Sequence, residues 1–180
     1  MFVVFTGLDG SGTSTLAQAV AGNSLLISTP GPCYGERNSI DGQVRAISPL
    51  AHYYYYLSSV VFASDTIRQH GGDAFCVRYA IDTVVSHQVM GLNVDLESVY
   101  ETTGILKPDY TFFIYTEEST RQNRLSARNY KSELDCVLDD ASVREKFLKS
   151  FSKYENQFIR IDNSGHLEGS VKKIMDVLYG

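Results

Sequence analysis

The segment Gly7-Leu-Asp-Gly-Ser-Gly-Thr-Ser-Thr15 constrains the fold of this chain more than any other feature of its sequence. It follows the apolar run Met1-Phe-Val-Val-Phe-Thr6, which is typical of a buried strand in a parallel sheet. It leads into Ser14 to Ala21, which reads as a helix that ends at Gly22. A glycine-rich turn between a buried strand and a helix predicts a loop whose backbone N–H groups converge on an anion.

The spacing within this segment matches the phosphate-loop consensus G-x-x-x-x-G-K-[ST], with one departure. Thr13 stands where the consensus has lysine, whose ammonium group normally reaches the β- and γ-phosphates. The Ser14 hydroxyl is at the position that coordinates Mg²⁺. We therefore predict ATP binding with Mg²⁺, through Gly7, Asp9, Gly10, Ser11, Gly12, Thr13, Ser14 and Thr15. The alternative is a tight turn that uses glycine for its geometry alone.

Strands and helices alternate along the rest of the chain. Further strands are predicted at 25–28, 75–77, 110–115 and 158–161. Helices are predicted at 50–69, 81–90, 95–104, 119–128, 142–154 and 167–178. This order indicates an α/β chain of the P-loop NTPase class, a three-layer α/β/α structure with a five-stranded parallel sheet.

Two of these helices carry candidate N-terminal signals. Ser119 is predicted to cap the helix that runs towards Arg128, and Ser142-Val-Arg-Glu145 has capping-box spacing. Between Ser28 and Leu50, the segment Thr29-Pro-Gly-Pro32 predicts a loop.

The composition favours one domain and a small ligand. The 180 residues are 43% hydrophobic, which is enough for one core, so we predict a single domain over residues 1–180. The formal net charge of -5 argues against nucleic acid as a partner. No run approaches the roughly 18 apolar residues of a membrane span. Together with three widely spaced cysteines, Cys33, Cys76 and Cys136, this leads us to expect a cytoplasmic protein without membrane or zinc partners.

The phosphate loop resembles that of the thymidylate kinase family, which reads G-[LI]-[DE]-G-x-G-K-[ST]-T. Phe62-Ala-Ser-Asp65 resembles the F-A-A-D of that family, whose aromatic ring stacks on the acceptor base. Arg78-Tyr79 resembles the second half of its D-R-Y motif, and Leu106 to Ile114 is similar to its P-D-x-x-x-x-L strand.

The resemblance continues to the end of the chain. Arg124 and Arg128 resemble the R-x-x-x-R that enters the family's lid, here a segment near 121–140. Ile161 to Glu168 is similar to the segment beside the donor adenine.

The resemblance implies a nucleoside monophosphate kinase-like fold and a homodimer built on the helix at 50–69. The catalytic residues that it implies are Asp9, Arg78, Arg124 and Arg128. The substrate-binding residues that it implies are Phe62, Asp65, Arg78, Tyr79 and Asp82. Asp9 could also be a turn-forming residue and Asp82 a helix cap.

Three positions depart from the family pattern. Thr13 replaces the lysine, Val77 replaces the D-R-Y aspartate, and Thr66 replaces an arginine that contacts thymine. The acceptor is therefore left open, and three functions remain. The first is an ATP-dependent phosphotransferase acting on a small acceptor, the second a catalytically degenerate nucleotide-binding protein, and the third a nucleotide hydrolase.

Three groups of side chains remain to be placed. Arg121, Arg124 and Arg128 share a helix face, from which an arginine could replace the lysine. Arg121 alone is predicted to be solvated and paired with acids. His52 and His87 have no recognisable partner spacing and are expected to be ordinary polar residues. The tyrosines 53–56 wrap more than one helix face, which is why a partner is expected there.

Overall fold

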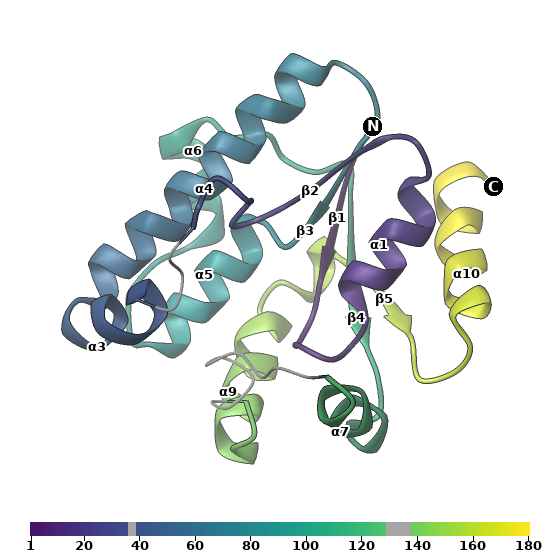
Figure 1. Cartoon of the computed structure of the whole chain (residues 1–180). Coiled ribbons are helices and arrows are strands. Elements are labelled where there is room, and N and C mark those ends of the chain that lie inside the picture. Colours follow the sequence, from purple (N-terminus) through teal and green to yellow (C-terminus); the bar gives the residue numbers. More distant parts are fainter. Residues whose placement is uncertain (36–38, 129–137) are drawn as a thin grey trace.

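The computed structural model of this chain describes residues 1–35, 39–128 and 138–180. As predicted, its centre is a five-stranded parallel sheet, with the strand order β2-β3-β1-β4-β5 (Figure 1). The strands are β1 (Phe2–Thr6), β2 (Leu25–Ser28), β3 (Ala74–Val77), β4 (Tyr110–Tyr115) and β5 (Ile159–Asp162). The central strand β1 is buried along its whole length, as its apolar sequence requires.

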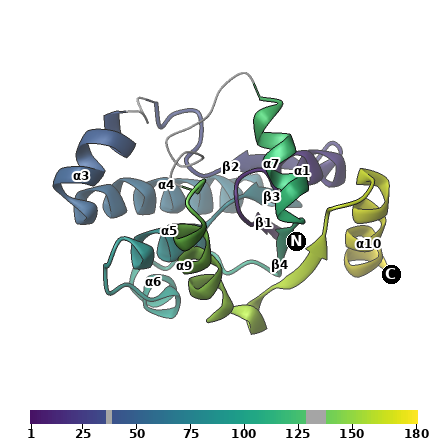
Figure 2. The ribbon, with the colours of Figure 1, turned by 90° about the horizontal axis from the view of Figure 1, so that it is seen from below.

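Helices cover both faces of the sheet, as the alternation of strands and helices predicts. One face carries α1 (Thr13–Ala21) and α10 (Leu167–Tyr179). The other carries α4 (Pro49–His70), α5 (Ala80–Val89), α6 (Leu96–Thr103) and α9 (Ala141–Ser152). Seen from below, these two groups lie on opposite sides of the strands (Figure 2). Alternate residues of β1 pack into two hydrophobic cores. Val3 and Phe5 lie in the core on the α1 face, and Phe2 and Val4 lie in the core on the α4 face.

Most helix ends follow from local chemistry. Gly71 and Gly104 adopt left-handed conformations after α4 and α6, and the side chains of Ser48 and Asp95 cap the starts of these helices.

Two predicted helix starts were wrong. The helix α7 (Glu118–Ser126) begins after Glu117, with Ser119 inside its first turn. Asp140, rather than Ser142, caps α9, and its carboxylate accepts a hydrogen bond from the Ser142 N–H at 2.8 Å.

The predicted loop at Thr29–Pro32 is not helical, but helical structure that the sequence pattern did not predict lies between it and α4. A π-helical turn, η1 (Ile40–Val44), leads into the short helix α3 (Arg45–Ile47). Tyr55 and Tyr56 of α4 hold this region, because their hydroxyls donate to the Gly35 carbonyl at 3.0 Å and to Asp41 at 2.6 Å. Part of the tyrosine run is therefore covered by the chain itself.

The remaining described segments complete the connections. The 3₁₀ turn η2 (Glu155–Gln157) precedes β5. Residues 129–137 of the predicted lid and Cys136 lie outside the described residues. Within the described ranges, no helix is both long and apolar enough to cross a membrane.

The parallel sheet determines where the site lies. The residues that follow β1, β3, β4 and β5 all emerge at the carboxyl edge of the sheet, because parallel strands share their direction. The Arg78 N–H donates to the Phe5 carbonyl at 2.8 Å, and the Asn163 N–H to the Tyr115 carbonyl at 2.8 Å. Thus Gly7, Arg78 and Asn163, which are far apart in sequence, meet at this edge.

Candidate active site

The glycine loop forms a tight cradle at the start of α1. Gly7, Gly10 and Gly12 have φ values of 148°, 86° and 95°, which residues with a side chain rarely adopt. A Cβ on Gly12 would lie 2.4 Å from Asn163 Nδ2, and one on Gly7 would lie 2.3 Å from the Ile114 carbonyl oxygen. Glycine is therefore required by both backbone conformation and space.

The hydroxyl groups of this loop differ in their surroundings. Thr13 is the first residue of α1 and is buried, whereas Ser14 and Thr15 are exposed. The Ser11 Oγ is buried and has no hydrogen-bond partner within the described residues. A buried hydroxyl without a partner is uncommon, and this one lies within the glycine loop.

Arg78 faces the loop from the end of β3. It is the non-glycine residue with a positive φ, 64°, in the described chain. Its guanidinium donates to the Gly7 carbonyl at 3.2 Å and forms ion pairs with Asp82, at 3.1 Å, and with Asp9. Although burial lowers the pKa of Arg78, the two carboxylates outweigh that effect and raise it. With 24% of its side chain exposed, Arg78 stays cationic and accessible at the sheet edge.

Asp82 supports Arg78 from within the fold. It is buried and accepts hydrogen bonds from the Thr6 hydroxyl at 2.7 Å and from the Tyr79 N–H at 3.0 Å. Burial raises the pKa of Asp82, and the Arg78 charge opposes this rise. Asp82 therefore acts as the helix cap that the sequence left open as an alternative.

Arg121 corrects the prediction of a solvated side chain. It is 2% exposed, and its guanidinium donates to both oxygens of Glu118, at 2.7 and 2.9 Å. It also donates to the Asp9 carbonyl at 2.9 Å and to the Leu138 carbonyl at 3.4 Å. The hydrogen bonds from Arg121 lower the pKa of Glu118 to about 2. Helical spacing could not reveal this burial, because the contacts come from distant segments.

Arg124 is the second α7 arginine at the loop. Its guanidinium donates to the Ser11 carbonyl at 3.2 Å and to the Asn163 carbonyl at 2.8 Å. Arg128 follows α7 and is exposed. The structure thus brings Asp9, Arg78 and Arg124 together around the loop, and places Arg128 beyond the end of the same helix.

The predicted acceptor-binding residues are more dispersed. Phe62 is 54% exposed on α4, and its ring centroid lies 6.3 Å from that of Tyr34. Asp65 pairs with Arg68 at 2.8 Å, and Arg68 also donates to the Gly104 carbonyl at the end of α6. Tyr79 is 1% exposed and packs edge-on against Phe2 at 5.0 Å. The side chain of Tyr79 therefore belongs to the core, and only its backbone supports the site.

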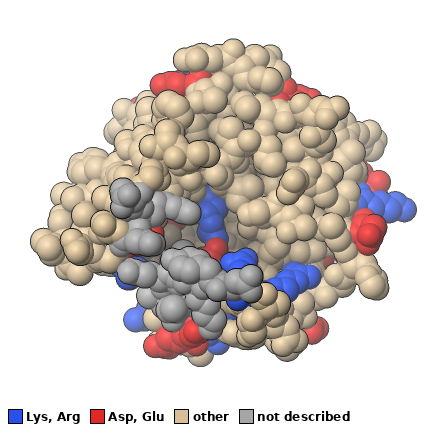
Figure 3. Space-filling model, viewed as in Figure 1, with Lys and Arg blue, Asp and Glu red and all other residues tan. Residues whose placement is uncertain are grey.

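The surface around the loop is hollowed. Figure 3 shows a concavity on this face, with Lys or Arg atoms at its floor. Among the described residues, no group of three or more His, Cys, Asp or Glu side chains could hold a metal ion. Val77, at the end of β3, offers no carboxylate.

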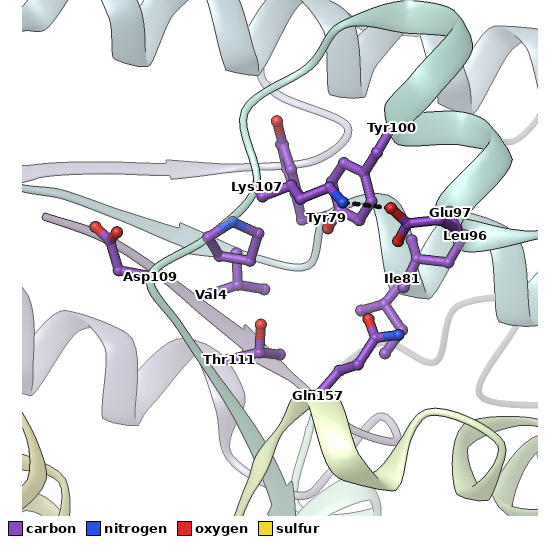
Figure 4. Close-up of a pocket in the computed structure, with 11 residues that line it drawn as sticks. Val4, Tyr79, Ile81, Leu96, Glu97, Tyr100, Lys107, Asp109, Thr111 and Gln157 are labelled. Carbon is purple, nitrogen blue, oxygen red and sulfur yellow. Dashed lines mark hydrogen bonds and ion pairs between the residues drawn. The ribbon is translucent and has the colours of Figure 1, made fainter.

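A second cavity, of about 320 Å³, lies between the sheet and helices α5 and α6 (Figure 4). Its lining includes Val4, Tyr100 and Thr111, with the ion pair between Lys107 and Glu97 at one side. Tyr79, which follows β3, also lines it. None of the glycine-loop residues lines this cavity.

A buried histidine pair lies between α4, α5 and η1. His52 Nδ1 is 2.8 Å from His87 Nε2, and His87 Nδ1 is 2.6 Å from the Thr83 carbonyl oxygen. Since that carbonyl can only accept, His87 Nδ1 carries a hydrogen and Nε2 accepts from His52. His52 Nε2 lies 3.0 Å from an Asp41 carboxylate oxygen. No sequence signal links residues 41, 52 and 87.

The comparisons with known proteins agree on one family. The model of the family described as thymidylate kinase matches residues 37–174, a range that begins after the glycine loop. A probable thymidylate kinase of Methanocaldococcus jannaschii is 25% identical over 191 residues, which cover 100% of this chain and 94% of that protein. A probable thymidylate kinase of Thermococcus kodakarensis is 26% identical, covering 83% of each chain. The structure of thymidylate kinase from Candida albicans matches with a TM-score of 0.68 at 17% identity, covering 98% of this chain and 90% of that one, a likeness that concerns the fold.

Proposed function

The chain belongs to the thymidylate kinase family, and on that premise we propose that it is an ATP-dependent phosphotransferase acting on a nucleoside monophosphate. Phosphoryl transfer depends mainly on the alignment of donor and acceptor oxygens and on positive charge around the transferring group. The residues at the carboxyl edge of the sheet are the groups of this chain that would supply both.

The observation that carries this proposal is a cradle with a cation at each end. The guanidinium of Arg78 contacts the loop at Gly7, and that of Arg124 contacts it at Ser11, each at 3.2 Å. Guanidinium groups are well suited to bind phosphate oxygens through two parallel hydrogen bonds. The start of α1 adds the partial positive charge of a helix N-terminus. The loop thus has cationic support without a lysine at Thr13.

The residues present fit a nucleotide phosphate well and Mg²⁺ in part. The cradle leaves no room for side chains at Gly7 and Gly12. Mg²⁺ bound to ATP would supply positive charge to the transferring phosphates. The exposed Ser14 hydroxyl is the group of this chain that would hold the ion, and the Asp9 carboxylate can orient its water ligands.

Arg78 and Phe62 support a monophosphate as the acceptor. The guanidinium of Arg78 is held by Asp82 and can bind the acceptor phosphate in place of its contact with Asp9. The half-exposed ring of Phe62 offers a surface on which a base can stack. Thr66 is too short to replace an arginine at the base edge, so we propose a base preference different from that of thymine-specific members.

A nucleotide-binding protein without transfer activity is the second candidate. It is favoured by Thr13 and Val77, which remove a charge and a carboxylate from the loop and from β3. The two candidates share the cradle and differ in whether a phosphoryl group moves.

We also propose a homodimer built on α4. The residues Leu50, Tyr54, Leu57 and Val61 follow one another at three- and four-residue steps along this helix. Leu50 and Tyr54 are 50% and 59% exposed, and Ile47 before the helix is 85% exposed. Such a stripe of apolar side chains suits a second copy of the chain.

We also propose a reducing, cytoplasmic location, which the free thiols Cys33 and Cys76 support.

Single-turnover transfer from labelled ATP to each nucleoside monophosphate, with Mg²⁺, tests the function. We expect one or a few acceptors to be phosphorylated by the natural chain and none by Gly12→Ala, because its Cβ would meet Asn163. Gly169→Ala on α10 is the matched control, since nothing lies within 4 Å of that position. ATP binding without transfer to any acceptor would favour the second candidate, and absence of ATP binding would contradict both.

A further inference from the structure

Two carbonyl groups of the phosphate loop accept hydrogen bonds from side chains of distant segments. The Asp9 carbonyl accepts a hydrogen bond from Arg121 Nη1 at 2.9 Å. The Ser11 carbonyl accepts hydrogen bonds from Asn163 Nδ2 at 2.8 Å and from Arg124 Nη1 at 3.2 Å. These donors come from α7 and from the residue after β5, more than 100 positions away in sequence.

This bracing fixes the direction of the next N–H groups. In a planar trans peptide, the C=O and the following N–H point in opposite directions. Since the Asp9 carbonyl points towards Arg121, the Gly10 N–H points away from α7. Since the Ser11 carbonyl points towards Asn163, the Gly12 N–H points away from it. Both N–H groups are thus directed away from the side chains that hold the loop, which leaves them able to donate to a phosphate.

Arg121 cannot itself serve as a phosphate ligand. It is 2% exposed, and its charge is balanced by two hydrogen bonds to Glu118. The helix packs directly under the loop, because a Cβ on Gly10 would lie 2.9 Å from both Arg121 Cγ and Leu125 Cγ. Asn163 is likewise buried, at 3% exposure. Both side chains act on a ligand only through the backbone that they hold.

We infer that Arg121 and Asn163 are positioning residues that hold the phosphate loop in its anion-binding conformation from outside. The inference rests on the proposed function, because it assumes a phosphate ligand in the loop. A loop ordered before binding loses less conformational freedom when the ligand arrives. In a loop without the lysine, the backbone N–H groups carry a larger share of the affinity, so their orientation matters more.

Calorimetric titration with inorganic tripolyphosphate tests the inference, because this probe requires the loop but no base pocket. We expect Arg121→Gln and Asn163→Asp each to weaken binding by roughly tenfold, the effect of losing one charge-assisted or oriented hydrogen bond. Asn163→Asp keeps the shape of the side chain but faces the Ser11 carbonyl with an acceptor. Arg121→Lys, which keeps the charge and one donor, should recover part of the loss.

Arg144→Gln is the matched control. Arg144 shares Glu118 with Arg121, at 3.3 Å, and donates to the Leu138 and Asp139 carbonyls at 2.7 Å; none of these partners, within the described part of the chain, belongs to the loop. This variant should lose stability comparable with that of Arg121→Gln while binding tripolyphosphate like the natural chain. Binding of Arg121→Gln and Asn163→Asp within twofold of the natural chain would overturn the inference and leave the proposed function intact.

A measurement on the natural chain removes the dependence on variants that fold poorly. During titration with tripolyphosphate, the amide protons of Gly10 and Gly12 should show the largest downfield NMR shifts in the loop. Binding without shifts at these two amides would overturn the bracing inference alone. A natural chain that binds neither tripolyphosphate nor ATP would overturn the bracing inference and the proposed function together.

Discussion

Because Thr13 stands where the phosphate-loop consensus has lysine, positive charge at the loop has to come from other residues. Thr13 is the first residue of α1 and only 7% exposed, so its short side chain adds no positive charge over the cradle. Arg124 lies close by, with Nη1 3.6 Å from the position of a Cβ on Gly12. The guanidinium of Arg124 is therefore the described α7 cation best placed to substitute for the lysine.

Removal of Arg124 should affect turnover much more than addition of a lysine at position 13. Loss of one preorganised charge at a phosphoryl-transfer site typically costs about 10² to 10³ in rate, so we expect Arg124→Ala to fall in that range. Thr13→Lys should raise the rate little, with Thr13→Ala as its matched control. Arg128→Ala should also be severe if Arg128 joins Arg124 over the donor. The measurement is single-turnover transfer with a saturating acceptor.

A different set of transfer rates would identify a nucleotide-binding protein without transfer activity. If the natural chain shows no transfer and the Thr13→Lys/Val77→Asp double variant does, the site has lost its charge and its carboxylate without replacement. A natural rate unchanged by loss of Arg124 and Arg128 would contradict the compensation by α7.

The buried ring of His87 makes stability depend on pH. Burial lowers the pKa of His87 to about 4, from 6.5 in an unfolded chain, although its hydrogen bond to the Thr83 carbonyl opposes the shift. Between these values the unfolded state binds more protons, so stability rises with pH through this window and is lost as pH falls. Between pH 7 and pH 5 the loss from His87 alone should be about 2 kcal/mol.

Urea unfolding at pH 7 and pH 5 measures this effect. His87→Gln removes the titrating ring, so its loss of stability between the two pH values should be smaller by about the same amount. An equal loss in both proteins would contradict the neutral, buried state of His87. Glu118 does not interfere, because its pKa of about 2 places its own stability change below pH 4.5.

At the scale of elements, most features that depend on local signals were predicted correctly, and the features that depend on distant contacts were missed. Helix α1 ends at Gly22 and α6 runs from its Asp95 cap to Gly104, as expected, because glycine and capping residues act within one turn. Helix η1 was missed because its anchors, Tyr56 and His52, belong to α4. Arg121 was misplaced for the same reason, since its buried partners are Asp9 and Leu138. The loop motif could be found from sequence, but the side chains that hold it could not.

The exposed apolar stripe of α4 predicts that the chain forms a homodimer through this helix. Tyr54→Glu should convert a dimer into a monomer, because a carboxylate would be buried without a partner in the interface. Tyr179→Glu on α10 is a closely matched control, since Tyr179 is 60% exposed and Tyr54 is 59% exposed. Light scattering coupled to size exclusion at micromolar concentration distinguishes the two states. A natural chain that remains monomeric as concentration rises would contradict the α4 interface.

At the scale of the whole molecule, the sheet topology gathers three arginines at one edge, where Asp9 and Asp82 pair with Arg78 and Glu118 pairs with Arg121. The formal net charge is -5, yet Arg78, Arg121 and Arg124 gather at the carboxyl edge around the loop. This concentration follows from the order β3-β1-β4, which places the ends of β1 and β3 side by side and brings α7 in after β4. An acidic protein of this kind can attract a small anion locally without a broad affinity for nucleic acid.

The same topology predicts that ligand binding stabilises the chain as one unit. The loop contacts β3 through Arg78, α7 through Arg121 and β5 through Asn163, so it cannot form in a partly unfolded sheet. We therefore expect one cooperative thermal transition for residues 1–180, which Mg²⁺-ATP shifts upwards without splitting. At a ligand concentration of 100 times Kd, the stabilisation is about 2.7 kcal/mol, which corresponds to a rise in Tm of roughly 5 to 10 °C for a chain of this size. Gly12→Ala should unfold in one transition that ATP does not move, whereas Gly169→Ala should retain the shift. Two separate transitions, only one of them sensitive to ATP, would contradict a single unit built around the loop.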